Sequence, residues 1–463
     1  LRKNSSSAVT AIGYESMTAN TSGEGSVAVG YQTLVANTTG SYNTVVGYQA
    51  MKLNTTGNYN TVYGYQALYN NVDGDRNTAI GLQALHSLEP SDGGGGNTAL
   101  GDRAGYTMST GHSNTILGYT AAYKHTTGER NVVIGHEAGY SGTTYNYNVL
   151  IGNAAGYHAS GMASGVYIGR NAGNHVSGSD NTFIGTSAGI GQSAATHATV
   201  GSVAIGKNAM YYNSTTNYCV AVGEAALMGA SSDPWMTGDY NTAIGRQALT
   251  STTSGYGNTA VGYIAGGSMT TGRDNTLMGL QAGQYNTTGV ENTVVGYLAG
   301  RNMAGGNYNT FLGWSAGYDN VGHRNTGLGY GAMFEYKQTG DGYNTAIGMY
   351  AMHQVETGSS NVAIGYTALR GATGNDMDYN VAIGAQALYS NTTGDENVAV
   401  GRNALFANTT GEHNIAIGTL AFDSNTTGVD NVIIGQNAAS GDNGNYNVVI
   451  GTDAAQGATT MDS

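Results

Sequence analysis

The stretch NTTGDENVAVGRNALFANTTGEHNIAIGTLAF, residues 391–422, contains the same short sequence twice. Each copy has an Asn, a β-branched residue, two apolar residues and a Gly, followed by an Ala three places after the Gly and by the turn sequence NTTG. The Gly of this unit recurs 26 times along the chain, most often after 17 residues, with spacings from 16 to 22. The chain is therefore a repeat array from near its first residue to near its last.

The five residues that end in this Gly predict a short strand. A β-branched residue stands three places before the Gly in all 26 copies, and an apolar residue stands directly before it. This pattern, opened by Asn and closed by Gly, is typical of β structure. A return after 17 residues leaves no room for a crossover helix and its loops, so the strands are expected to stack as rungs. We predict an all-β parallel β-solenoid of about 26 coils, with a lead-in at residues 1–8, a continuous array at 9–456 and a tail at 457–463.

Two further columns of the repeat indicate how neighbouring coils contact each other. Ala follows the Gly by three places in 24 of 26 copies, with Ser16 and Thr33 as the exceptions, which predicts a close approach of two backbones. Asn opens 21 of the 26 strands and is expected to form a ladder of amides bonded from coil to coil. In NTTG, Asn and Thr are expected to bond local backbone and Gly to take a positive φ.

The central residue of each strand leads to a prediction about assembly. Alternation places the two flanking residues on one face, which we interpret as the core face, and the central residue on the other. The central residue is nevertheless apolar in most copies, and a strand that is apolar on both faces is buried on both. Because a long apolar stripe is not tolerated on a soluble monomer, we predict an assembly in which copies of the chain associate laterally along their whole length. Its interface column contains Val45, Val62, Ile116, Val133, Leu150, Phe183, Leu277, Val294, Phe311 and Ile433. The alternative is that a solitary solenoid tolerates Ala-rich outward positions.

The composition excludes several classes of protein. With 75 Gly, 34 Tyr and only 2 Pro in 463 residues, the chain matches neither disordered proteins nor collagen. A net charge of −13 would repel a phosphate backbone, so no nucleic-acid partner is expected. No apolar run is long enough for a membrane helix, so no membrane insertion is expected.

Residues for catalysis or for metal binding do not gather in the sequence. The acidic residues lie mostly in turns, at about one per coil, and are interpreted as a solvated rim. His112, His125 and His136 lie in different coils without metal-ligand spacing, which favours a role in surface solvation. We therefore expect no enzyme activity, no cofactor and no metal site.

Tyr columns and inserted loops are the candidate binding features. Tyr recurs just after the Gly and just before the opening Asn, where it would form aromatic ladders or stack on sugar rings. Longer coils contain Pro90, Pro234 and Trp235, which are candidate contacts for a receptor or glycan. Equally, Trp235 would serve only to cover a wider coil.

The repeat resembles those of two families. SVAVG at 26–30, SVAIG at 202–206 and NVAIG at 361–365 resemble the repeat of trimeric autotransporter adhesin heads, in which three left-handed parallel β-rolls pack about one axis. YNTVVGYQAMKLNTTG at 42–57 is similar to the long repeat arrays of bacteriophage tail fibres, which often precede a self-cleaving chaperone. The coil is longer than that of the adhesin heads, and the sequence shows no neck, stalk or barrel anchor. The ending TTMDS is expected after removal of a C-terminal chaperone, although a chain shortened in another way would end in the same manner.

These resemblances imply a left-handed solenoid, a homotrimer and an extracellular location. The expected function is the rigid shaft of a phage tail fibre on the virion, which presents or contributes to host-receptor binding. The alternative is a bacterial cell-surface adhesin head that binds a host surface or glycan.

Overall fold

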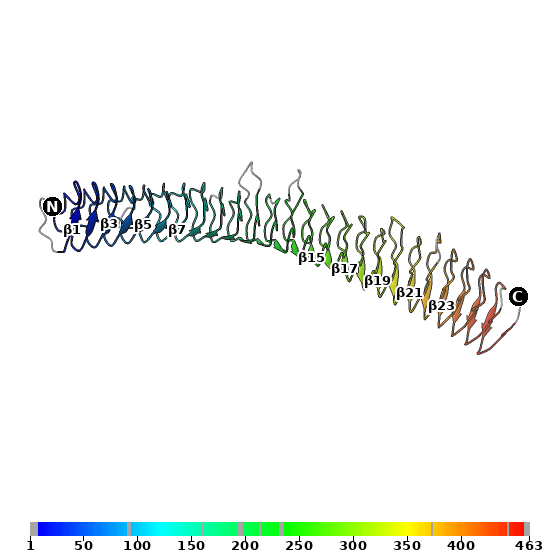
Figure 1. Cartoon of the computed structure of the whole chain (residues 1–463). Coiled ribbons are helices and arrows are strands. Elements are labelled where there is room, and N and C mark those ends of the chain that lie inside the picture. Colours follow the sequence, from blue (N-terminus) through cyan, green and yellow to red (C-terminus); the bar gives the residue numbers. More distant parts are fainter. Residues whose placement is uncertain are drawn as a thin grey trace. The chain divides into compact units, whose positions relative to one another are not determined.

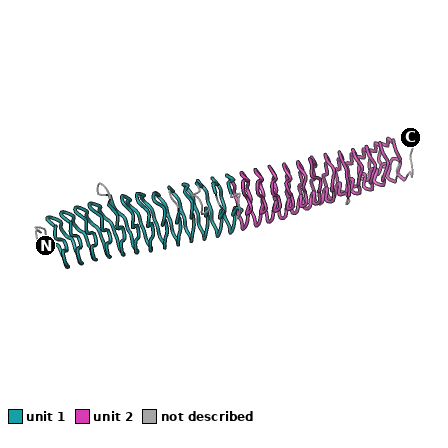
Figure 2. Tube along the Cα trace, turned by 90° about the horizontal axis from the view of Figure 1, so that it is seen from above, with its two compact units in different colours: residues 1–239 teal, residues 240–463 magenta. Residues whose placement is uncertain are grey.

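The computed structural model describes residues 8–89, 94–158, 161–191, 198–212, 214–230, 236–371, 374–441 and 444–457. The chain divides into two compact units, Leu1–Asp239 and Tyr240–Ser463 (Figure 2). The described residues of both units contain strands and turns but no helix, and hence no helix that could cross a membrane.

Every strand has three residues and ends directly before the Gly of the repeat. The strands of unit 1 are β1 (Thr10–Ile12), β2 (Val27–Val29), β3 (Thr44–Val46), β4 (Thr61–Tyr63), β5 (Thr78–Ile80), β6 (Thr98–Leu100), β7 (Thr115–Leu117), β8 (Val132–Ile134), β9 (Val149–Ile151), β10 (Val166–Ile168), β11 (Thr182–Ile184), β12 (Val203–Ile205) and β13 (Val220–Val222). The strands of unit 2 are β14 (Thr242–Ile244), β15 (Thr259–Val261), β16 (Thr276–Met278), β17 (Thr293–Val295), β18 (Thr310–Leu312), β19 (Thr326–Leu328), β20 (Thr345–Ile347), β21 (Val362–Ile364), β22 (Val381–Ile383), β23 (Val398–Val400), β24 (Ile415–Ile417), β25 (Val432–Ile434) and β26 (Val448–Ile450).

Within each unit, successive strands pair in parallel, column on column (Figure 1). Between β3 and β4, for example, Thr44 lies opposite Thr61 and Val45 opposite Val62. The turns are bonded in the same way, since the N–H of Met51 donates to the carbonyl of Ala67 at 2.9 Å. The parallel β-solenoid with a repeat of about 17 residues, predicted from the sequence, is thus confirmed.

The Gly that ends each strand is required by the distance between coils. Gly47 has a φ of 145°, and a Cβ added there would lie 2.2 Å from the carbonyl oxygen of Gly64 in the next coil. Three places further on, Ala50 is fully buried, as are the Ala residues at this position in neighbouring coils. Only a residue without a side chain fits the first position, and the second accepts no more than a small one.

The predicted Asn ladder is present, and a second ladder runs beside it. The side-chain Nδ2 of Asn60 donates to Oδ1 of Asn43 at 3.0 Å and to the carbonyl of Gly74 at 3.0 Å, and its backbone N–H reaches the same Oδ1 at 2.9 Å. The Asn of NTTG forms the second ladder, in which Asn54 donates to Oδ1 of Asn37 at 2.7 Å. All of these amides are buried, so each coil satisfies polar groups of its neighbours that would otherwise be left unpaired away from water.

The structure corrects the predicted orientation of the strands. The central residue of each strand points into the core of its own coil, and the two flanking residues point outward. The predicted interface column is buried within the single chain at no more than 1% exposure, and its assignment to contacts with sister chains is wrong: Val45, Val62, Ile116, Val133, Leu150, Phe183, Leu277, Val294, Phe311 and Ile433.

The physical reason for the large central residues is the fixed volume of a narrow core. The residue four places after the Gly also enters this core, and its size complements that of the central residue. Ala243 is paired with Leu249, whereas Phe311 is paired with Gly317, where an added Cβ would lie 2.5 Å from the Phe311 ring. Most coils therefore fill this space from one side or from the other. Ala99 with Gly105 and Ala260 with Gly266 are exceptions, where Leu or Ile side chains of the neighbouring coils enter the space.

Candidate functional site

The outer face of the sheet is a regular apolar surface in both units. It consists of the flanking residues of each strand: Thr, Val or Ile three places before the Gly and a mainly aliphatic residue directly before it. Leu100 and Leu117, which lie side by side on β6 and β7, are 42% and 41% exposed. None of the strands contains a charged residue. In both units, a row of aliphatic side chains on this face is exposed to water, with one side chain per coil.

Aromatic side chains form stacks along the flanks of unit 1. Tyr14, Tyr31, Tyr48 and Tyr65, each directly after the Gly, lie with ring centroids 4.9–5.2 Å apart. A longer stack occupies the position five places after the Gly, with neighbouring centroids 5.0–5.3 Å apart, and contains Tyr69, His86, Tyr106, Tyr123, Tyr140 and Tyr157. The aromatic ladders predicted from the sequence are confirmed, whereas stacking on sugars stays a prediction.

Unit 2 contains an aromatic group that the sequence reasoning missed. Trp314 follows the Gly of its coil, is 42% exposed, and stacks between Tyr297 and Tyr330 with centroid distances of 5.9 and 4.4 Å. Its place in the Tyr column was a visible signal in the sequence, since Tyr48 and Tyr65 occupy the same repeat position.

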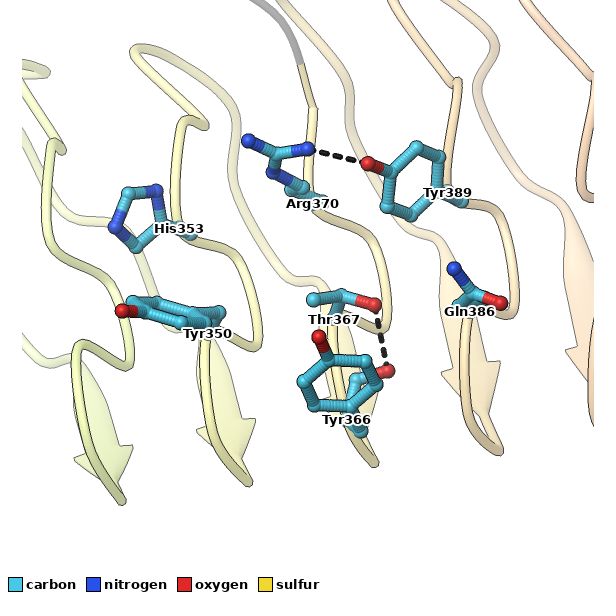
Figure 3. A pocket seen from close by; sticks show the side chains of 7 residues that line it. All are labelled: Tyr350, His353, Tyr366, Thr367, Arg370, Gln386 and Tyr389. Atoms are coloured by element: carbon cyan, nitrogen blue, oxygen red, sulfur yellow. Dashed lines mark hydrogen bonds between the residues drawn. The ribbon is translucent and has the colours of Figure 1, made fainter.

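A cavity of about 380 Å³ opens in the flank of unit 2 (Figure 3). Three successive coils line it: Tyr350 and His353 follow β20, Tyr366, Thr367 and Arg370 follow β21, and Gln386 and Tyr389 follow β22. Two rows of side chains are visible in Figure 3, with His353, Arg370 and Tyr389 in one row and Tyr350, Thr367 and Gln386 in the other.

The cavity arises where the repeat departs from its usual packing. In unit 1, Gln49 and Gln66 occupy the position two places after the Gly and join their amides at 3.0 Å, which closes the surface. At the same position in unit 2, the ring of Tyr350 leans back over Gly331, where an added Cβ would lie 2.8 Å from the ring carbons. The next coil has the smaller Thr367 there, so space remains between the Tyr350 ring and Gln386.

The charged and polar groups of the cavity are mostly cationic or neutral. Arg370 donates a hydrogen bond to the hydroxyl of Tyr389 and lies 5.4 Å from the centre of that ring. Among the described residues, no carboxylate is paired with Arg370 and none lines the cavity. Burial, followed by the nearby Arg370 guanidinium, lowers the pKa of His353, and the buried Nδ1 of its ring has no hydrogen-bond partner among the described residues.

The candidate contacts named from the sequence, which are Pro90, Pro234 and Trp235, all fall outside the described residues. The described part of the chain contains no group of three His, Cys, Asp or Glu side chains that could hold a metal ion. His125, expected at the surface, is instead buried against Tyr145, with ring centroids 4.0 Å apart.

The cavity could not be found by searching for motifs, because its residues are ordinary members of three repeats. The available signal was the interruption of two columns at once, with Thr367 where Gln is frequent and Arg370 where aromatic residues are frequent. No family model matches the sequence, and no curated protein was found to be similar to it.

Proposed function

We propose that the chain forms the rigid shaft of an extracellular homotrimeric fibre, of the kind found in phage tail fibres, which presents or contributes to host-receptor binding. The observation that supports this proposal best is the outer face of the sheet, where an uncharged row of aliphatic side chains faces water in a single chain. Such a surface favours lateral association with copies that carry the same row at the same spacing. The flanking residues of the strands, instead of the central ones, are therefore the surface through which copies would associate.

The bonds between coils support the mechanical part of the proposal. Backbone hydrogen bonds, two Asn ladders and stacked rings join each coil to the next within a unit. Each coil contacts mainly its immediate neighbours, so the length of the array sets the spacing that a shaft provides.

A second candidate function is that of a left-handed trimeric adhesin head on a bacterial surface, which binds a host surface or glycan. The exposed aromatic columns favour it, Trp314 in particular, because aromatic side chains are frequent at binding hot spots. In this alternative the flanks of the solenoid carry the function, and the assembly again forms through the sheet.

The assembly is tested by measuring the mass of the native particle by light scattering at increasing urea concentrations. Wild type is expected to have the mass of three chains. The double variant Leu100→Lys/Leu117→Lys should dissociate at lower urea than wild type, because each buried Lys is left without a partner at the interface.

The matched control is Leu82→Lys, since Leu82 is 41% exposed but follows the Gly and so lies off the sheet face. This variant should dissociate as wild type does. A wild-type particle with the mass of one chain would refute the assembly, and equal dissociation of the two variants would refute the sheet face as its interface.

A further inference from the structure

We propose that the cavity between the coils of β20, β21 and β22 binds one residue of an acidic carbohydrate, with the sugar carboxylate held by Arg370. A volume of about 380 Å³ lies within the range of small-molecule sites, ~300–1,000 Å³. The site lies on the flank, outside the strand face, so it exists in a single chain and does not depend on the proposed assembly.

Arg370 supplies the charge that selects an acid. Its guanidinium is oriented by the hydrogen bond to Tyr389 and by the ring beneath it, and no carboxylate among the described residues neutralises it. A guanidinium has donors left after one such bond and matches the geometry of a carboxylate. In a chain with a net charge of −13, a cavity lined by Arg without an acid is a local exception.

The remaining groups fit a sugar ring better than a small inorganic anion. Tyr350 and Tyr366 offer apolar ring surface together with hydroxyl groups, as the non-polar and polar parts of a sugar require. The side-chain amide of Gln386 makes no hydrogen bond with a described residue, in contrast to the paired amides of Gln49 and Gln66. This free amide is available to sugar hydroxyl groups.

A phosphate ion would use only part of this site. Phosphate sites are usually built from several cations or from convergent backbone N–H groups, whereas here a single Arg stands among aromatic and neutral polar side chains. The cavity therefore favours a ligand with one carboxylate and an extended polar body.

The experiment measures binding of methyl glucuronide to the full-length chain at pH 7.5 by saturation-transfer NMR and calorimetry, with methyl glucoside and inorganic phosphate as comparison ligands. Glucuronide should bind more tightly than either. The variant Arg370→Gln should lose about tenfold in affinity, because a hydrogen bond between charged groups is lost, and Thr367→Tyr should abolish binding by filling the cavity.

Arg301→Gln is the matched control. Arg301 occupies the same repeat position and donates to the hydroxyl of Tyr318 at 2.8 Å in the same way, but it does not line the cavity. This variant should bind as wild type does. Equal binding of glucuronide and glucoside, tighter binding of phosphate, or unchanged affinity in Arg370→Gln would each overturn the proposal. A chain that stays monomeric but binds glucuronide would refute the fibre and leave this site intact.

Discussion

Asn43, Asn60 and Asn77 show how one side chain acts in this molecule. The Oδ1 of Asn60 accepts the backbone N–H of Asn77 at 2.9 Å, just as the Oδ1 of Asn43 accepts that of Asn60. An Asn side chain can hydrogen-bond the Asn at the same position in the next coil, because an amide has both donors and acceptors. Residues that cannot do so must be accommodated in another way, and the second Asn column provides an example.

His125 occupies that column where Asn54 and Asn71 stand in earlier coils. Both of its ring nitrogens are buried without a hydrogen-bond partner among the described residues, and the ring packs against Tyr145. In the coil of Tyr145, the column has Gly142, and the Tyr145 ring fills the space that a longer side chain would occupy. Burial lowers the pKa of His125 to about 4.

This pKa predicts that acidification weakens unit 1. In the unfolded chain the imidazole titrates near its ordinary pKa of ~6.5, so below that pH the unfolded state binds a proton that the folded state does not accept until about pH 4. Stability is therefore complete above pH ~6.5 and is lost as the pH falls through this window. Between pH 7.5 and 5 the loss should be about 2 kcal/mol, measured by amide hydrogen exchange of the surrounding coils.

The variant His125→Met is the control for this prediction. Met108 holds the same repeat position in the preceding coil, where it is fully buried, so a Met should be tolerated here. Since Met does not titrate, the pH dependence between 5 and 7.5 should shrink by the same amount. An unchanged pH dependence in the variant would show that other groups cause it.

At the scale of the strand and its turn, the sequence predicted the positions of the elements but not their orientation. The strands begin three residues before each repeat Gly and end one before it, as the β-branched and apolar columns indicated. Alternation separates the residues of a strand into two sets, but it does not say which set is inside. The β-branched column is regular because its members pair with one another on the outer face, as Thr44 does with Thr61.

The correct orientation was encoded in a relation between two positions of the same coil. The aromatic central residues all occur with Gly four places after the repeat Gly, as in Phe183 with Gly189, and most central Ala residues occur with Leu or Met, as in Ala363 with Leu369. When one side chain is large wherever the other is small, the two must fill the same space in the core. The candidate site could not be predicted, because it depends on how three neighbouring coils leave space between them.

Because the two side chains fill the same space, we predict that two substitutions in unit 2 have non-additive effects on the free energy of unfolding. Phe311→Ala should lower the free energy of unfolding by about 3–5 kcal/mol, because it leaves a cavity. Gly317→Leu alone should also destabilise, since its Cβ would lie 2.5 Å from the Phe311 ring. The double variant Phe311→Ala/Gly317→Leu reproduces the Ala and Leu pairing of other coils and should recover most of the loss.

Urea unfolding of the four proteins in this cycle measures the coupling between the two sites. The backbone at Gly317 should accept a Leu, because Leu249 and Leu369 adopt positive φ values of 49° and 48° at the equivalent position. Additive effects of the two substitutions would contradict the shared cavity.

At the scale of the whole molecule, the coils of each unit are stacked in register. Each ionisable side chain is therefore a neighbour of the residue at the same repeat position in the next coil. Asp378, Asp395 and Glu412 occupy one column of unit 2, and Oδ1 of Asp395 accepts the N–H of Asp378 at 2.7 Å. Burial raises the pKa of Asp395, and the carboxylates of Asp378 and Glu412 add to the effect. A run of acids in a column is therefore unfavourable, even though Asp378 and Asp395 each accept a backbone hydrogen bond.

We predict that Asp395→Asn stabilises unit 2 at pH 7, by up to about 1 kcal/mol. The raised pKa means that the ionised form is disfavoured in the folded state, so the cost is present at neutral pH and disappears as the pH falls through the folded pKa. The hydrogen bond should survive, because Asn58 accepts the N–H of Ser41 at 2.9 Å in this column. Urea unfolding at pH 7 and pH 3 measures the difference.

Asp75→Asn is the control in unit 1. Asp75 accepts the N–H of Asn58 at 2.6 Å, but its column neighbours Asn58 and Gly95 are uncharged. This variant should change stability little at either pH. A stabilisation by Asp395→Asn that persisted at pH 3 would mean that charge repulsion and burial of the carboxylate are not its cause.

The stacking of coils in register also accounts for the low content of charged residues. If the same charged residue stood at one repeat position in every coil, like charges would lie ~4.8 Å apart along the stack. Each adjacent pair would then repel by about 1 kcal/mol even in water. That self-repulsion accumulates with every added coil, whereas amides, hydroxyl groups and rings attract their own copies. This cost explains why only 10% of the residues of such a repeat array are charged.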